Sequence, residues 1–133
     1  MPMNNQIIRI GAIAAAIAVI LGAFGAHKLK ELLDENALAT WETACRYQFY
    51  HALALVLTGI LFTQKSSPSY RWAMRFFLAG IFLFSGSIYL LSIRSLLDVN
   101  VLWVGPVTPL GGLCFIVGWI FLAFPKNPEK TSV

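Results

Sequence analysis

The side chains best suited to chemistry cluster in one short run, Arg46-Tyr47-Gln48-Phe49-Tyr50-His51, which leads into a long apolar segment. Histidine titrates near physiological pH and is a common metal ligand. Ionisable groups placed among apolar helices are expensive and are often functional. His27, the other of the two histidines, ends another apolar segment, and we expect both near the same face of the protein. The sequence therefore indicates a candidate polar or ligand site made of His27, Arg46, Tyr47, Gln48 and His51.

A purely structural role explains the same residues. A histidine at a helix end commonly bonds a backbone carbonyl, and Tyr and Arg are typical of the belt at a membrane surface. Two histidines without a placed third ligand fall short of a metal site, since zinc sites take three or four protein ligands. Glu42 is a poor third ligand, because its helical direction points away from His51. We predict no metal, no cofactor and no catalytic residue.

The elements that must position these residues are membrane helices. The 133 residues are 58% hydrophobic and 12% charged, with a mean hydropathy of +0.72, whereas soluble domains carry roughly 25% charged residues. Four stretches lack Asp, Glu, Lys and Arg, and each is close to or longer than the ~20 residues that span a bilayer. The sequence predicts an all-α protein, a four-helix transmembrane bundle forming one domain over residues 1–133, with helices at about 8–26, 41–63, 72–93 and 109–124.

Small residues predict where these helices touch. In the first helix, Gly11 and Gly22 share a stripe with alanines, while bulky side chains such as Ile13 and Ile20 lie opposite. Helices in lipid associate by close backbone approach, so small stripes should face protein and bulky ones lipid. Gly86 in the third helix and Gly111 and Gly118 in the fourth are assigned the same packing role.

The connections carry weaker signals. Apolar and charged residues alternate between His27 and Cys45, which indicates a short helix at the membrane interface between the first two membrane helices. Thr108-Pro109 suits a helix start, with Thr as the N-cap and Pro at the first position. Cys45 and Cys114 have no metal-binding spacing, and we expect free thiols rather than a disulfide.

The net charge of +4 reflects ten Lys and Arg against six Asp and Glu. These basic residues lie mainly at helix ends and not in a nucleic-acid-binding motif, so no nucleic acid is expected. Six of them fall on the side of both termini and four on the other side, which favours cytoplasmic termini in a cell inner membrane. The first helix is expected to be retained rather than cleaved as a signal peptide.

Four runs together resemble one family. They are Gly22-Ala23-Phe24-Gly25-Ala26-His27, the segment from Tyr47 to Leu55, Gly86-Ser87-Ile88-Tyr89-Leu90, and Thr108-Pro109-Leu110-Gly111-Gly112 through Trp119. In this ordered set the chain resembles the YgdD-like small inner-membrane proteins, catalogued as domain of unknown function 423 and related to transmembrane protein 256. The resemblance covers about residues 8–125. It implies an integral membrane protein of four helices and assigns no catalytic residue.

Three hypotheses of function follow. The first is a non-enzymatic structural or accessory membrane component that contacts the lipid bilayer and either a second copy of itself or another membrane protein. The alternative is a small oligomeric transporter or channel whose Tyr47, His51 and Thr58 stripe faces water or a subunit seam. The third is an enzyme with a metal or lipid cofactor around His27 and His51. The sequence has no nucleophile elbow, phosphate loop or carboxylate pair, so we expect no enzyme.

Overall fold

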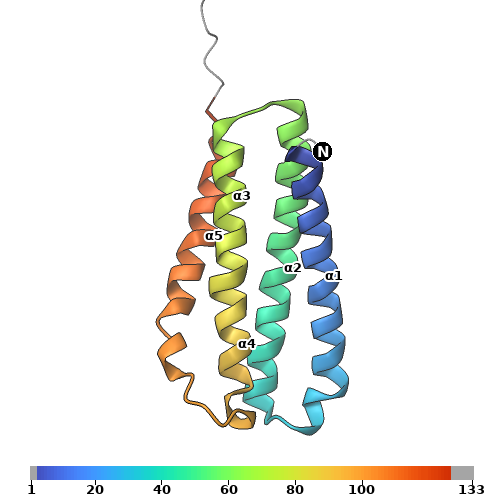
Figure 1. Cartoon of the computed structure of the whole chain (residues 1–133), viewed down its shortest axis with the longest axis vertical. Helices are drawn as coiled ribbons and strands as arrows, with labels where there is room; N and C mark the ends of the chain where they lie inside the picture. Colours follow the sequence, from blue (N-terminus) through green and yellow to red (C-terminus); the bar gives the residue numbers. More distant parts are fainter. Residues whose placement is uncertain (1–2, 127–133) are drawn as a thin grey trace, which may run out of the picture.

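The chain folds into four antiparallel helical rods joined by short connections (Figure 1). The computed structural model describes residues 3–126, and no strand occurs among them. The first and last described residues lie at the same end of the molecule (Figure 1). The elements in chain order are α1 (Met3–His27), η1 (Leu29–Glu31), α2 (Glu35–Gln64), α3 (Pro68–Gly80), the π-helical segment η2 (Ile81–Ser85), α4 (Gly86–Ser92), η3 (Arg94–Leu96), η4 (Leu102–Val104) and α5 (Val107–Ala123).

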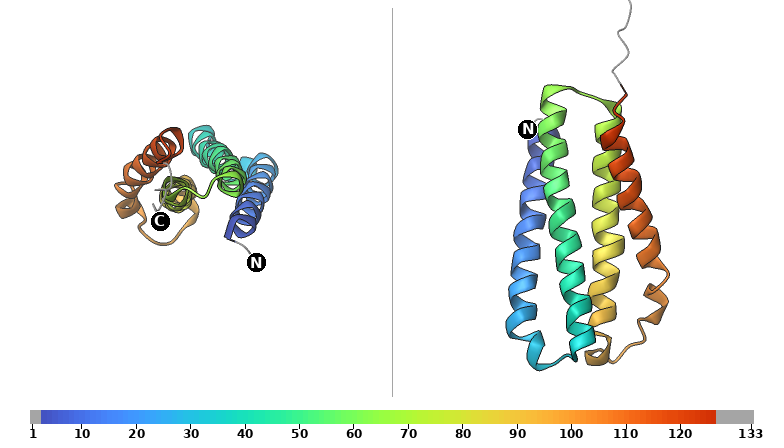
Figure 2. Two further views of the ribbon diagram at one scale, coloured as in Figure 1. Left: turned by 90° about the horizontal axis from the view of Figure 1, so that it is seen from above. Right: turned by 180° about the vertical axis from the view of Figure 1, so that it is seen from behind.

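The rods form an open bundle. α3, η2 and α4 run on as one rod, which packs on α2 on one side and carries α5 on the other, while α1 packs on α2. Viewed from above, α1 and α5 lie at opposite edges and do not meet (Figure 2). The expected all-α architecture of four helices is thus confirmed for residues 3–126. Three segments are long and apolar enough to cross a membrane: Asn5–Glu31, Pro68–Ser92 and Leu102–Ala123.

α2 starts earlier than the sequence suggested. It begins at Glu35 rather than near residue 41, because the Asp34 carboxylate accepts a 2.8 Å hydrogen bond from the backbone N–H of Ala37 and so caps the helix. The segment expected to form a separate short helix is therefore divided. Its first part is the single 3-10 turn η1, and its second part is the opening turns of α2. The location of this segment at a membrane interface stays a prediction.

Two other helices, α3 and α5, also begin earlier than the sequence suggested. α3 begins at Pro68, four residues before the expected residue 72, because the Ser67 hydroxyl caps it and Pro suits the first helical position. α5 begins at Val107, after Pro106 at the N-cap position, so Thr108 is already helical. The Thr108 hydroxyl is instead 2.6 Å from the Ser87 hydroxyl of α4. Thr108, which the sequence predicted as the N-cap, thus links α5 to α4 instead.

Large apolar side chains cover the outer surface of the bundle. Ile13, Ile17 and Ile20 of α1 are 56%, 45% and 66% exposed, and α5 presents Leu113 and Ile116 in the same way. The interior holds smaller residues and aromatic rings, with Leu55 and Phe77 fully buried. A surface of this kind suits lipid, because contact with hydrocarbon carries no penalty for apolar side chains.

Glycines set the closest approaches between rods. A Cβ on Gly11 would lie 2.8 Å from Val56 of α2, and one on Gly118 would lie 2.8 Å from the Phe77 ring. The tightest contact is at Gly111, where a Cβ would overlap the backbone nitrogen of Phe84. By contrast, a Cβ on Gly22 would meet nothing within 4 Å, and one on Gly86 would meet only the Ile81 carbonyl at 4.0 Å.

These contacts predict unequal effects of the same substitution. Gly111→Ala forces the backbones of α5 and η2 apart, because a methyl group there overlaps main-chain atoms that cannot rotate away. We expect a loss of about 1–3 kcal/mol in the free energy of unfolding. Gly22→Ala is the control and should change stability by less than about 0.5 kcal/mol. Thermal unfolding of both variants in detergent measures the difference, and equal stabilities would contradict the close packing of α5 on η2.

Candidate functional site

α2 carries the largest polar side chains in the interior of the described part of the protein. Gln48, His51 and Thr58 are 6%, 5% and 0% exposed, and Trp41 is 6% exposed. A buried polar group is expensive unless it is hydrogen-bonded. Each of these four side chains has such a bond, and three of them reach another rod. The candidate site is therefore a set of bonds that α2 makes to its neighbours.

Gln48 joins three rods. Its amide Nε2 donates to the Ala14 carbonyl of α1 at 2.9 Å, and its Oε1 accepts from the Tyr89 hydroxyl of α4 at 2.9 Å. The Tyr89 ring also packs on Trp41, with 4.7 Å between centroids. The Trp41 Nε1 in turn donates to the Leu21 carbonyl of α1 at 2.9 Å. Together these bonds fix the register of α1 and α4 against α2.

Both ring nitrogens of His51 are hydrogen-bonded, one within α2 and the other to α5. Nδ1 lies 2.7 Å from the Tyr47 carbonyl, and Nε2 lies 3.2 Å from Nε1 of Trp119. An indole N–H can only donate, so Nε2 of His51 must be the unprotonated acceptor. The proton then sits on Nδ1 and is donated to the Tyr47 carbonyl. This network assigns the neutral Nδ1–H tautomer to His51.

An aromatic groove lies beside His51, between α2 and α5. The imidazole stacks on Phe115, with centroids 3.4 Å apart and planes 8° apart, and the Tyr47 ring lies 4.8 Å from Phe84 of η2. The groove has a volume of about 630 Å³. Its surface is mainly apolar, and the groove opens to the outside of the bundle. Its lining residues are Tyr47, His51, Phe84, Pro109, Gly112, Leu113, Phe115, Ile116 and Trp119.

The rod of α3, η2 and α4, which packs on α2, contains an unusual turn. Residues Ile81–Ser85 are π-helical, and Gly111 of α5 packs against the backbone of this turn at Phe84. π-turns are rare and often occur at functional sites. Ser85, at its end, is fully buried, and its hydroxyl is the one buried side-chain oxygen in the described part of the chain without a hydrogen-bond partner.

The structure brings together only part of the predicted site. Tyr47 and His51 stack with 6.1 Å between centroids, and Gln48 lies on the adjoining side of α2, facing α1. Arg46 points outward and is exposed. His27 is exposed at the end of α1, beyond the level of Trp41, so His51 lies at least about 15 Å further along the bundle at 1.5 Å per residue.

Three partners in the site were missed in the sequence: Trp41, Tyr89 and Trp119. A signal for them exists, because the N–H of a buried Trp and the hydroxyl of a buried Tyr each require an acceptor. Tyr89 and Trp119 occur in apolar helices that pack against α2, and Trp41 lies on α2 itself. Over residues 3–126 no group of three or more His, Cys, Asp and Glu side chains is placed to hold a metal ion. Cys45 and Cys114 are both free thiols.

Comparison with known proteins gives a clear result. The model of the family described as "Protein of unknown function (DUF423)" matches residues 21–112. The chain belongs to the DUF423 family. The resemblance seen in the sequence is thereby confirmed.

Relatives of this DUF423 protein are named as membrane proteins. The UPF0382 membrane protein SAB0533 of Staphylococcus aureus (strain bovine RF122 / ET3-1) is 44% identical over 113 residues, which cover 85% of this chain and 88% of the relative. The UPF0382 membrane protein YwdK of Bacillus subtilis is 43% identical over 117 residues, with 85% and 89% covered. A UPF0382 membrane protein of Haemophilus influenzae is 37% identical over 129 residues, with 97% and 99% covered. No solved structure matches this chain significantly.

The structure and the family agree on a first conclusion. Three segments of this DUF423 protein are long and apolar enough to cross a membrane, and similar proteins of nearly the same length are membrane proteins. The protein is therefore a membrane protein of an uncharacterised family.

The Gln48 bridge predicts a stability loss. Gln48→Leu removes both interhelical bonds and leaves the hydroxyl of the half-buried Tyr89 without its acceptor. We expect a decrease of about 0.5–2 kcal/mol in the free energy of unfolding, the range of polar contacts between membrane helices. Gln64→Leu, at the exposed end of the same helix, is the matched control and should have little effect. Reversible unfolding in detergent measures both variants, and an equal response would show that the bridge contributes nothing.

The tautomer of His51 can be observed directly. Nitrogen NMR of protein labelled at histidine should show the ring proton on Nδ1 and none on Nε2. Trp119→Phe removes the indole N–H that donates to Nε2 and should shift that nitrogen's resonance, while Trp103→Phe, at a 73% exposed tryptophan, should not. A proton found on Nε2 would rule out the bond between His51 and Trp119.

Proposed function

We propose that this protein is a non-enzymatic structural or accessory component of the cell inner membrane and that it works through helix contacts. One observation carries the proposal: the interior polar groups of α2 are used to hold neighbouring helices. Both nitrogens of His51 and both ends of the Gln48 amide are bonded within the protein. A general base or a nucleophile needs a free atom that faces its substrate, and these side chains present none.

In this proposal all four rods cross the bilayer. α2 is more polar than the others, but its buried side chains Gln48 and His51 bond to α1, α4 and α5 rather than meeting lipid. An intramembrane helix tolerates such residues when they face protein. Its 30 residues give a length of about 45 Å at 1.5 Å per residue, which exceeds the ~30 Å hydrocarbon core. The turn η1 then lies at one membrane surface, with Leu29 buried and Lys28 and Glu31 exposed.

Charge supports an orientation with cytoplasmic termini. The end of the bundle that holds both described termini is basic, whereas the other end mixes three Lys and Arg with acidic residues such as Asp34 and Asp98. Cytoplasmic ends carry an excess of Lys and Arg. The basic residues at the end that holds the described termini are Arg9, Lys65, Arg71, Arg75 and Lys126.

The transporter alternative requires the stripe of Tyr47, His51 and Thr58 to face water or a subunit seam. Thr58 is fully buried and donates to the Ala54 carbonyl of its own helix at 2.6 Å. His51 is covered by Phe115 and bonded to Trp119. Tyr47 and the 5% exposed His51 line an open surface, and that surface is a mainly apolar groove. This geometry favours helix packing over conduction.

A flux experiment separates the two functions. Purified protein reconstituted in vesicles of phosphatidylethanolamine and phosphatidylglycerol should pass protons, K⁺ and small sugars no faster than protein-free vesicles. His51→Ala should leave that background unchanged, because no permeation path depends on its side chain. Gramicidin-treated vesicles serve as the positive control for cations. Flux above background that disappears in His51→Ala would overturn the accessory role.

A further inference from the structure

One face of α2 is covered by no other rod. α1 packs against one side of the helix, and the rod of α3, η2 and α4 packs against another. Residues on the remaining side recur at spacings of four and three, which places them in one stripe along the helix. All of them are exposed, and two are charged. We call this the free face of α2; it comprises Glu42, Arg46, Tyr50, Leu53, Leu57 and Ile60.

Along the bundle, Arg46 of α2 lies level with the middle of the apolar part of α1. It shares a groove with Ala18, and this level is fixed by the bonds of Trp41 and Gln48 to α1 on either side of it. Ala18 is nine residues after Arg9 and ten before Lys28. The nearest charges on α1 are therefore about 14 Å away on one side and about 15 Å on the other.

The rod of α3, η2 and α4, the second neighbour of α2, places Arg46 at the same depth. Tyr47, next to Arg46, contacts the ring of Phe84 in η2. Phe84 is nine residues after Arg75 and ten before Arg94, the charges that bound the apolar part of that rod. Two independent neighbours thus place Arg46 near the middle of the apolar zone. Glu42 is one helical turn, about 6 Å, closer to the edge of that zone.

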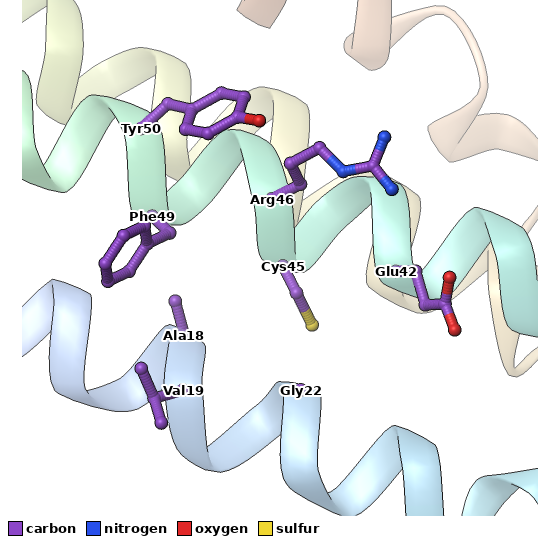
Figure 3. A pocket seen from close by; sticks show the side chains of 8 residues that line it. All are labelled: Ala18, Val19, Gly22, Glu42, Cys45, Arg46, Phe49 and Tyr50. Carbon is purple, nitrogen blue, oxygen red and sulfur yellow. The ribbon is translucent and has the colours of Figure 1, made fainter.

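Neither charge is compensated within one copy. Among the described residues neither Glu42 nor Arg46 forms a hydrogen bond or an ion pair, and the described ion pair is the exposed Lys28–Glu31 pair at the end of the bundle. Glu42 and Arg46 are four residues apart on one helix, but their charged groups are not paired. Figure 3 shows the Arg46 guanidinium extending toward the turn that carries Glu42, while the carboxylate points outward. Charged residues at membrane depth face protein or pair with one another. Lipid tails supply neither.

We propose that a second copy of this chain covers the free face of α2, forming a dimer in which each Arg46 pairs with the partner subunit's Glu42. The inference deepens the proposed accessory role and rests on it for the crossing of α2. A two-fold axis along the membrane normal places equivalent residues at equal depth. Arg46 must then reach about 6 Å toward the N-terminus of the neighbouring α2. Helical side chains lean in that direction. The face that carries Arg46 and Glu42 is therefore complementary in charge to the same face of a second copy.

The surface next to the charges allows a helix to come close. A groove of about 380 Å³ lies between α1 and α2 and is lined by Ala18, Gly22, Cys45 and Phe49 as well as by the two charges (Figure 3). The open space over Gly22 leaves room for a side chain from another helix. An acyl chain fits the apolar part of the groove but leaves Arg46 and Glu42 without partners. A second copy satisfies both requirements.

Charge exchange tests the pairing. Full-length protein with two fluorescent labels is reconstituted in phosphatidylethanolamine and phosphatidylglycerol vesicles over a range of densities, and dimers are counted by photobleaching. Glu42→Arg and Arg46→Glu should each weaken dimerisation by about 30-fold or more, because like charges then meet in a medium of low dielectric constant. Mixing the two variants should restore the dimer, since each mixed pair recovers two opposite-charge contacts. Pairing within one copy predicts no such rescue.

Three controls make the result decisive. Glu31→Arg makes the same charge change in the exposed pair and should leave dimerisation unchanged. Gly22→Leu alters no charge but fills the groove and should reduce dimerisation. Reporter fusions at the C-terminus and after Asp98 show whether each variant retains its four crossings, which separates a failure of the dimer from a failure of the proposed membrane arrangement. The proposal is overturned if the wild-type protein is monomeric at every density. It is also overturned if the charge variants dimerise normally or are not rescued by mixing.

Discussion

The rest of this structure depends on the need to satisfy polar groups away from water. In hydrocarbon, a backbone or side-chain polar atom without a partner is strongly unfavourable. α2 carries the largest of these buried groups, and its neighbours are arranged around them: Gln48 sets the position of α1 and α4, and His51 sets that of α5. Hydrogen bonds between membrane helices contribute about 0.6 kcal/mol on average. Their value here lies in register, because one residue of sliding would break several of them together.

Glycine and aromatic packing complete this arrangement. Gly111 lets α5 lie on the backbone of the π-turn η2, and Gly118 accommodates the ring of Phe77. Phe115 can then stack on His51 at van der Waals distance and hold the imidazole in the plane in which it meets Trp119. Polar bonds select the register, and the small residues make the corresponding distances attainable. α1 and α5 each pack on one side only, so the bundle stays open at its edges (Figure 2).

Much of the fold follows from the sequence, and the exceptions have physical causes. Stretches free of charge predicted the helices because bilayer thickness fixes their length, and the isoleucine stripe of α1 is on the outside as expected. The start of α2 was misplaced because a cap at Asp34 can open a helix long before its apolar part begins. Of the candidate site, Gln48, Tyr47 and His51 were found from residue type. Trp119 and Tyr89 were not, because the helix that faces a given polar group is decided by three-dimensional packing.

The position of Arg46 shows why order along the chain is a poor guide to depth. In sequence it borders an apolar run and resembles an interfacial anchor. In space, α2 extends more than two turns beyond it toward η1, and its two neighbours have their charges about equally far above and below. An arginine at the centre of a membrane helix is unfavourable by about 2.5–3.5 kcal/mol on insertion scales. In the proposed arrangement α2 crosses the bilayer, and since its inner faces are already filled, that penalty falls on its outer face. The same helix that organises the protein internally is therefore the one least stable against lipid alone, which makes its outer face the natural place for an assembly contact.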